Sequence, residues 1–178
     1  MKRLIALLIV LLIAVMPSAM METEGFSPFD FHVKYTANGK YIVYEFPDIM
    51  LYIPIEWMDG ITVEQTDTGA AFFQTASYDK FLEDGLPKGG FLFKLRASED
   101  ESFRERPEYE YIGFSENAGL HFYLSLPSDY QAYVYDPEIR AEYDDMHKQI
   151  SDIASTAKIS RSMYFYTDGI ESTDPGMS

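Results

Sequence analysis

Alternating apolar and polar positions mark the first half of the chain as antiparallel β-structure. Residues 31–36 alternate between the two classes, and 40–46 form an apolar return segment. Between them stands Asn38-Gly39, a dipeptide that favours a tight hairpin turn because both turn positions take positive φ. The same patterning predicts further strands over 49–53, 61–64 and 70–75 and a short helix over 77–83.

The second half continues this strand pattern. Strands are predicted over 91–95, 109–114 and 120–126, with a charged loop over 97–107 between the first two. The third has the clearest alternation, since Leu120, Phe122 and Leu124 share one face. A short final strand is expected over 163–166.

One long helix is predicted near the C-terminus. Asp136 is suited to the N-cap and Pro137 to the first helical position. One apolar stripe at helical spacing follows: Ile139, Tyr143, Met146, Ile150, Ile153 and Ala157. The predicted fold class is therefore α+β, an antiparallel sheet of about six to eight strands with this helix packed lengthwise on it.

The N-terminus has the organisation of a secretory signal peptide. Lys2 and Arg3 precede an apolar run over 4–15, and small residues follow it. The run is shorter than the roughly 20 residues of a membrane-spanning helix. We expect cleavage after Ala19; the alternative is an uncleaved signal anchor. The predicted organisation is a signal peptide over 1–19, a linker over 20–30, one domain over 31–167 and a disordered tail over 168–178.

Four segments carry a resemblance to known proteins. They are IPIEW (53–57), GFLFKL (90–95), LPSDYQ (126–131) and EYDDM (142–146). These segments resemble short exported bacterial proteins of unknown function, and the layout is distantly similar to the PsbP-like α/β/α sandwich. The resemblance covers about residues 40–158 and implies a fold without transferable catalytic residues. By analogy alone it suggests an accessory factor of a membrane complex.

Composition removes several function classes. The chain has no cysteine, which excludes thiol nucleophiles, thiolate metal sites, disulfides and a lipid-anchored cysteine. It has 14 basic and 29 acidic residues, and the predicted signal peptide contains two of the bases and none of the acids, which leaves a net charge of −17. Such a surface repels phosphate backbones and anionic lipids. We therefore expect no nucleic-acid partner. No stretch after the predicted signal peptide is apolar enough to span a bilayer, so we expect no membrane span after signal cleavage.

Candidate catalytic and metal-binding residues are few. The three histidines are His32, His121 and His147, and no nucleophile elbow or phosphate-binding glycine loop is present. Asp144 and His147 stand three residues apart on the predicted helix, a spacing that metal ligands use, but Tyr143 and Met146 beside them are expected to face the core. We predict no catalytic residue, no metal and no cofactor. Any of the acids could meet as a glycosidase pair, although so small a fold is expected to leave little room for a sugar cleft.

Tyrosines are concentrated near the end of the predicted sheet. The group comprises Tyr109, Tyr111, Tyr123, Tyr130, Tyr133 and Tyr135. We expect most rings to be half-buried with the hydroxyl in water, so that alanine at two or more of Tyr130, Tyr133 and Tyr135 is strongly destabilising. The alternative is a groove for a peptide or glycan, with these candidate ligand-binding residues: His121, Tyr123, Tyr130, Tyr133 and Tyr135.

The sequence leaves the specific function open. A signal peptide and a well-patterned core without a catalytic motif favour an exported, acidic, monomeric domain. We expect a non-enzymatic module that binds a protein, peptide or glycan at the cell surface or in the cell wall. The alternatives are a small extracytoplasmic hydrolase and an accessory factor of a membrane complex.

Overall fold

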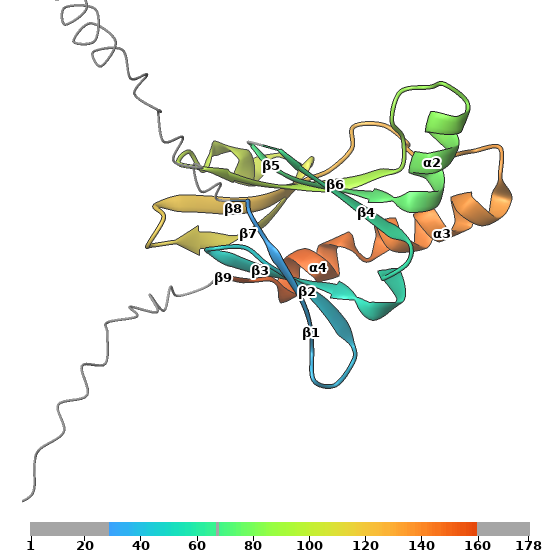
Figure 1. The fold of residues 1–178 in the computed structure, drawn as a ribbon. Helices are drawn as coiled ribbons and strands as arrows, with labels where there is room; N and C mark the ends of the chain where they lie inside the picture. The colour runs from blue at the N-terminus through green and yellow to red at the C-terminus, as the bar shows by residue number, and fades with distance from the viewer. Residues whose placement is uncertain (1–28, 67, 160–178) are drawn as a thin grey trace, which may run out of the picture.

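Residues 29–66 and 68–159 are described by a computed structural model (Figure 1). They form two antiparallel sheets with helices at one end and along one side. The α+β class is as predicted. The predicted signal peptide, most of the linker, the strand over 163–166 and the tail lie outside the described residues.

The first sheet has four strands in the order β1-β2-β3-β9. Its members are β1 (His32–Tyr35), β2 (Tyr41–Glu45), β3 (Ile49–Pro54) and β9 (Lys158–Ile159). A tight turn connects β1 to β2 at the predicted dipeptide, but only Gly39 has a positive φ (+67°), and Asn38 does not. The Gly39 amide donates to the Thr36 carbonyl at 2.9 Å, and the Asn38 side chain accepts a hydrogen bond from the Lys40 amide at 3.1 Å. The two-residue strand β9 was not predicted, because so short a segment has no readable alternation.

The second sheet has five strands in the order β4-β5-β6-β8-β7. They are β4 (Ile61–Thr66), β5 (Gly69–Gln74), β6 (Phe91–Ser98), β7 (Tyr109–Ser115) and β8 (Leu120–Ser125). The prediction of one sheet was therefore wrong. Pro54 ends β3, and the 3-10 turn η1 (Ile55–Trp57), anchored by the buried Trp57, redirects the chain. As a result β4 pairs with β5 and not with β3.

The predicted long helix is present but bent. The Asp136 side chain caps α3 (Pro137–Lys148), accepting hydrogen bonds from the amides of Glu138 and Ile139. The chain bends at Gln149 and continues as α4 (Ile150–Thr156). Tyr143, Met146, Ile150 and Ile153 are buried, as the apolar stripe predicted. The bend places α3 against β6 and α4 against β3 and β7, so one apolar stripe contacts both sheets.

One core joins the sheets. The Tyr44 ring of β2 meets the Phe72 ring of β5 edge-on at 5.2 Å, and Phe72 stacks on Phe93 at 4.5 Å. Phe29, which the prediction placed in the linker, belongs to this core. The predicted charged loop contains a further anchor, since the 3-10 turn η2 (Ser102–Glu105) buries Phe103.

The short helix α2 (Thr75–Glu83) follows β5 as expected. None of the described helices has the length and apolarity needed to cross a membrane.

Candidate functional site

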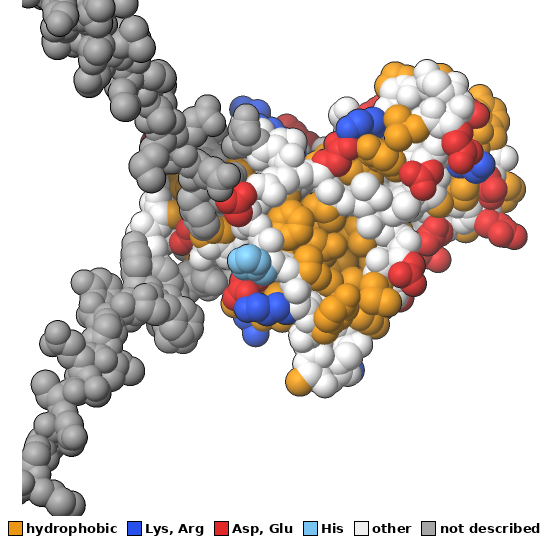
Figure 2. Space-filling view, in the orientation of Figure 1, with side chains coloured by type: hydrophobic (Ala, Val, Ile, Leu, Met, Phe, Trp, Pro, Cys, Tyr) orange, Lys and Arg blue, Asp and Glu red, His pale blue; other side chains and the backbone are white. Residues whose placement is uncertain are grey.

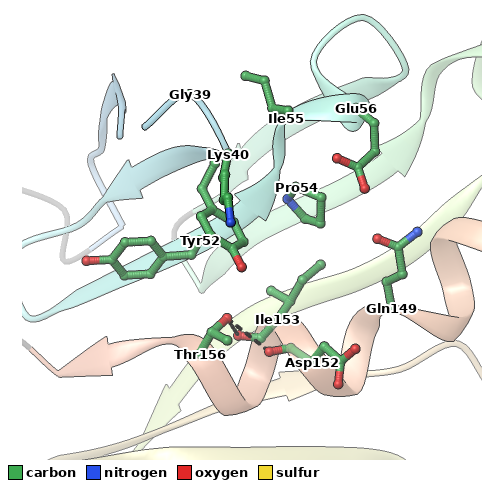
Figure 3. Close-up of a pocket in the computed structure, with 11 residues that line it drawn as sticks. Gly39, Lys40, Tyr52, Pro54, Ile55, Glu56, Gln149, Asp152, Ile153 and Thr156 are labelled. Atoms are coloured by element: carbon green, nitrogen blue, oxygen red, sulfur yellow. Dashed lines mark hydrogen bonds between the residues drawn. The ribbon is translucent and has the colours of Figure 1, made fainter. Parts of the chain in front are cut away.

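A groove of about 410 Å³ lies between the end of the β1–β2 hairpin and α4 (Figure 3). Three segments form it: residues 39–41 at the hairpin, β3 with the start of η1, and the outer face of α4 from Gln149 to Thr156. Pro54 contributes apolar surface, and the buried Ile153 lies beneath the floor of the groove. The groove therefore exists because η1 turns the chain away from α4 just where the helix bends.

Three charged side chains in this groove lack a partner within the described chain. Lys40, Glu56 and Asp152 are exposed, and neither a hydrogen bond nor an ion pair to a described residue engages their charged groups. Glu56 and Gln149 extend toward one another across the mouth of the groove (Figure 3). The Gln149 amide nitrogen donates to the Asp145 carbonyl at 3.2 Å, which leaves its oxygen as an acceptor.

The other end of the groove is aromatic and more positive. The Tyr41 and Tyr52 rings meet edge-on at 6.0 Å, and the Lys158 ammonium lies 5.1 Å from the centre of the Tyr52 ring. The Thr156 hydroxyl donates to the Asp152 carbonyl at 2.9 Å. Among the side chains that line the groove, acceptors predominate, because Glu56, Asp152 and the Gln149 amide oxygen outnumber the one ammonium donor, that of Lys40.

A second depression, of about 450 Å³, contains the predicted residue Tyr130. The Tyr130 side chain is 51% exposed, its ring contacts Tyr143, and its hydroxyl donates to Asp144 at 2.7 Å. Partial burial and this hydrogen bond raise the pKa of Tyr130. Asp144 is therefore engaged by Tyr130, while His147 stacks on Tyr143. Within the described ranges, no three histidine or acidic side chains are grouped to hold a metal ion.

The structure divides the predicted tyrosine groove among separate surfaces. His121 and Tyr123 lie on β8, where the Tyr123 ring stacks on Phe103 at 3.7 Å and is 7% exposed. The Tyr133 ring packs on Phe81, and its hydroxyl donates to Asp84 at 2.6 Å. Tyr135 is 80% exposed and touches Tyr133. No ring contact among the described residues joins His121 or Tyr123 to Tyr130, Tyr133 or Tyr135.

The core interpretation of the tyrosines thus holds for some and not for others. Tyr123 is buried, and Tyr109, Tyr111 and Tyr133 are half-buried as expected, whereas Tyr130 and Tyr135 are exposed. Strand alternation placed Tyr123 on the polar face of β8. That face is covered by η2. We did not predict η2, because the charged residues around Phe103 favoured a solvated loop.

The groove residues were not recognised from the sequence. Glu56 lies within the segment IPIEW, which we used only for the resemblance, and Asp152 falls off the apolar stripe of the helix. The two are nearly a hundred residues apart, so no spacing rule connects them. The bend at Gln149 brings them to one groove, and the sequence carries no proline or glycine that would have marked this bend.

Comparison with known proteins gives no relative. No protein-family model, curated protein or solved structure matches this chain. The resemblance to the PsbP-like sandwich and to short exported bacterial proteins therefore stays a prediction.

Proposed function

We propose that this chain is an exported, non-enzymatic binding domain whose groove beside α4 takes a glycan rich in amino or hydroxyl donors. The observation that carries the proposal is the set of charged side chains around one groove, Lys40, Glu56 and Asp152, that the protein itself leaves unpaired. Exposed side chains of this kind lose little on binding, because they exchange water for ligand hydroxyl or ammonium groups. The partly exposed Pro54 and Tyr52 supply apolar contact area for a sugar ring.

The side chains that line the groove favour a glycan. Tyr41 and Pro54 are paired in the β2–β3 ladder, and the Ile55 amide donates to the Lys40 carbonyl at 3.0 Å. This ladder engages the β2 side of β3, while β9 pairs with β3 only at Ile49 and Met50, so a glycan is favoured by the side chains of the groove and not by its backbone. Side-chain oxygens predominate among the polar groups, and they suit separate hydroxyl and amino donors.

A second candidate function follows from the same groove. Glu56 and Asp152 are two carboxylates beside one open space, which is the chemical equipment of glycoside hydrolysis. We expected little room for a sugar cleft in so small a fold, and the groove removes that objection. Hydrolysis is thus the rival to binding alone, and product analysis separates the two.

Location and architecture complete the proposal. A cleaved signal peptide over 1–19 would place a monomeric domain outside the cytoplasm, at the cell surface or in the cell wall. The PsbP-like relationship, and with it a role as accessory factor of a membrane complex, rests on the resemblance alone.

Calorimetric titration with two matched probes tests the proposed function. We expect the glucosamine tetramer, which carries free amines, to bind more tightly than the N-acetylglucosamine tetramer. Glu56→Gln and Asp152→Asn should each weaken binding about tenfold, or about 1.4 kcal/mol. The matched control is Glu105→Gln, an exposed η2 carboxylate without a hydrogen-bond or ion-pair partner among described residues, and it should leave affinity unchanged. Failure of both probes to bind at millimolar concentration would contradict the proposal.

Product analysis on the same mixtures decides between binding and hydrolysis. An intact tetramer after prolonged incubation supports a binding domain. Shortened products that disappear in Glu56→Gln or Asp152→Asn would establish the hydrolase. Turnover lost in His121→Ala or His147→Ala would instead identify a histidine-dependent enzyme.

A further inference from the structure

A cluster of exposed apolar side chains occupies the α2 end of the molecule, away from the groove. We call it the aromatic end; its members are Phe81, Leu82, Leu86, Tyr133, Val134 and Tyr135. Four of them are large and strongly exposed: Leu82 (46%), Leu86 (44%), Val134 (50%) and Tyr135 (80%). Figure 2 shows apolar surface at the α2 end with acidic side chains along its border. Adjacent exposed apolar residues with a polar rim are typical of interaction sites.

Internal contacts hold this surface in place. The Phe81 ring meets the Tyr133 ring edge-on at 5.6 Å, and Tyr133 meets Tyr135 in the same way at 5.5 Å. The Leu86 amide donates to the Phe81 carbonyl at 2.9 Å, and the Tyr133 amide donates to the Ser77 hydroxyl at 2.9 Å. The Phe81 and Tyr133 rings and the backbone around them are therefore already positioned before a partner binds, which lowers the entropic cost of binding.

The rim of the aromatic end is negatively charged. Asp79, Glu83, Asp84 and Glu138 are exposed carboxylates on or beside α2 and at the start of α3. The two nearby lysines are engaged within the chain: Lys80 pairs with Glu83 at 2.7 Å, and Lys88 pairs with Glu64. With Lys80 and Glu83 offsetting each other, Asp79, Asp84 and Glu138 remain without an ion-pair partner among the described residues, so the rim is acidic and a cationic partner is complementary to it.

The aromatic end also lies clear of both ends of the described chain. The ribbon begins ahead of β1 and ends at β9, on the side of the molecule opposite α2 (Figure 1).

We propose that the aromatic end docks a basic polypeptide segment whose apolar side chains contact Leu82 and Tyr135 while its lysines or arginines face the acidic rim. A second copy of this chain fits less well, because a two-fold interface would set one acidic rim against the other. Anionic lipid headgroups are repelled for the same reason.

Fluorescence anisotropy of labelled synthetic peptides tests the proposal on the full chain. The probe has a Trp- and Leu-containing centre flanked by lysines. One counterpart replaces the lysines by glutamates, and another replaces the apolar centre by serines. We expect the first peptide to bind at least tenfold more tightly than either counterpart and to weaken as salt is raised, because the rim is exposed. Equal affinity for the three peptides, or no binding at millimolar concentration, would overturn the proposal.

Surface variants locate the binding. Tyr135→Ser and Leu82→Ser should each weaken the lysine peptide about fivefold or more, with the unfolding midpoint retained because both side chains are exposed. The matched controls are Phe114→Ser on β7 and Tyr35→Ser on β1. Both residues are exposed and lie outside the aromatic end, so these variants should change affinity less than twofold. Equal loss in variants and controls would overturn the docking site.

Two further measurements address the other occupants and independence from the groove. Binding to phosphatidylcholine vesicles that is lost in Tyr135→Ser would assign the surface to a membrane and overturn the proposal. Dimerisation in sedimentation that is lost in Tyr135→Ser would assign it to a second copy and overturn it equally. Glu56→Gln should leave peptide binding unchanged, so that failure of the glycan proposal and failure of this one are distinguishable.

Discussion

Tyr143 shows how burial sets the properties of a single side chain in this protein. The residue is 1% exposed, and its hydroxyl donates to the Phe91 carbonyl at 2.8 Å. Burial, with a further contribution from the nearby Tyr130 hydroxyl, raises the pKa of Tyr143 far above its usual value. Burial likewise raises the pKa values of Tyr44 and Tyr123. These phenols stay protonated in the folded state at pH values where the unfolded chain ionises.

Stability is therefore expected to fall in alkali. Below about pH 10 the tyrosines are protonated in both states, and above it the unfolded state loses protons first, so the free energy of unfolding decreases as pH rises. Urea unfolding between pH 8 and 11.5 measures this slope. Tyr143→Phe should be less stable by about 1 kcal/mol at pH 8 through the lost hydrogen bond. Its slope above pH 10 should also be shallower, and an unchanged slope would contradict the role of Tyr143.

Truncation of individual tyrosines should rank with their burial. Tyr143→Ala removes a core ring and is expected to cost about 3–5 kcal/mol. Tyr135→Ala and Tyr130→Ala should each cost about 1 kcal/mol or less, as exposed substitutions do. Tyr133→Ala should fall between, because its half-buried ring packs on Phe81. Thermal unfolding of the four variants checks this order. It replaces the expectation from the sequence that alanine at two or more of Tyr130, Tyr133 and Tyr135 is strongly destabilising.

At the scale of elements, strands and helices follow local pattern while their association does not. Alternation and the Asn38-Gly39 turn located the first hairpin, and the apolar stripe located α3 and α4. Three features were not predicted from the sequence: the division into two sheets at η1, the bend at Gln149 and the packing of η2 over β8. Each depends on where a single large side chain or a short turn packs in the folded chain. Hydrophobic periodicity predicts the type of an element but not the elements against which it packs.

The N-cap of α3 is an element whose contribution can be measured directly. The Asp136 carboxylate accepts from two amides that have no helical partner. Asp136→Ala should therefore lower the free energy of unfolding by about 1 kcal/mol, within a range of roughly 0.5–2. Asp145→Ala, in an exposed pair with Lys148 on the same helix, is the control and should cost about 0.5 kcal/mol or less. Equal losses in chemical denaturation would argue against the cap.

At the scale of the molecule, the fold separates two surfaces of different chemistry. The groove beside α4 offers unpaired carboxylates to a polar ligand, and the aromatic end offers an exposed apolar surface with an acidic rim. Neither could be assembled from the sequence, because each gathers residues from segments far apart in the chain. The exclusions drawn from charge and from the absence of cysteine needed no structure, since they follow from composition alone.

Export is a whole-molecule prediction that stands apart from the fold. Expressed with its own N-terminus in a bacterial host, the protein should appear outside the cytoplasm, shortened by about 19 residues as expected for signal cleavage. N-terminal sequencing that begins near Met20 would confirm cleavage, and full-length protein in the membrane fraction would favour the signal anchor. Full-length soluble protein in the cytoplasm would contradict both.

Backbone amide NMR during titration with the glucosamine tetramer tests the central claim of a glycan-binding groove most directly. Saturable shifts should concentrate at three places that converge only in the folded chain: the end of the first hairpin near Lys40, η1 around Glu56 and α4 around Asp152. The Glu56→Gln protein should show the same shifts only at about tenfold higher ligand concentration, the loss of about 1.4 kcal/mol. Shifts confined to the β8 face or to α2, or no saturable shifts at millimolar ligand, would contradict the account.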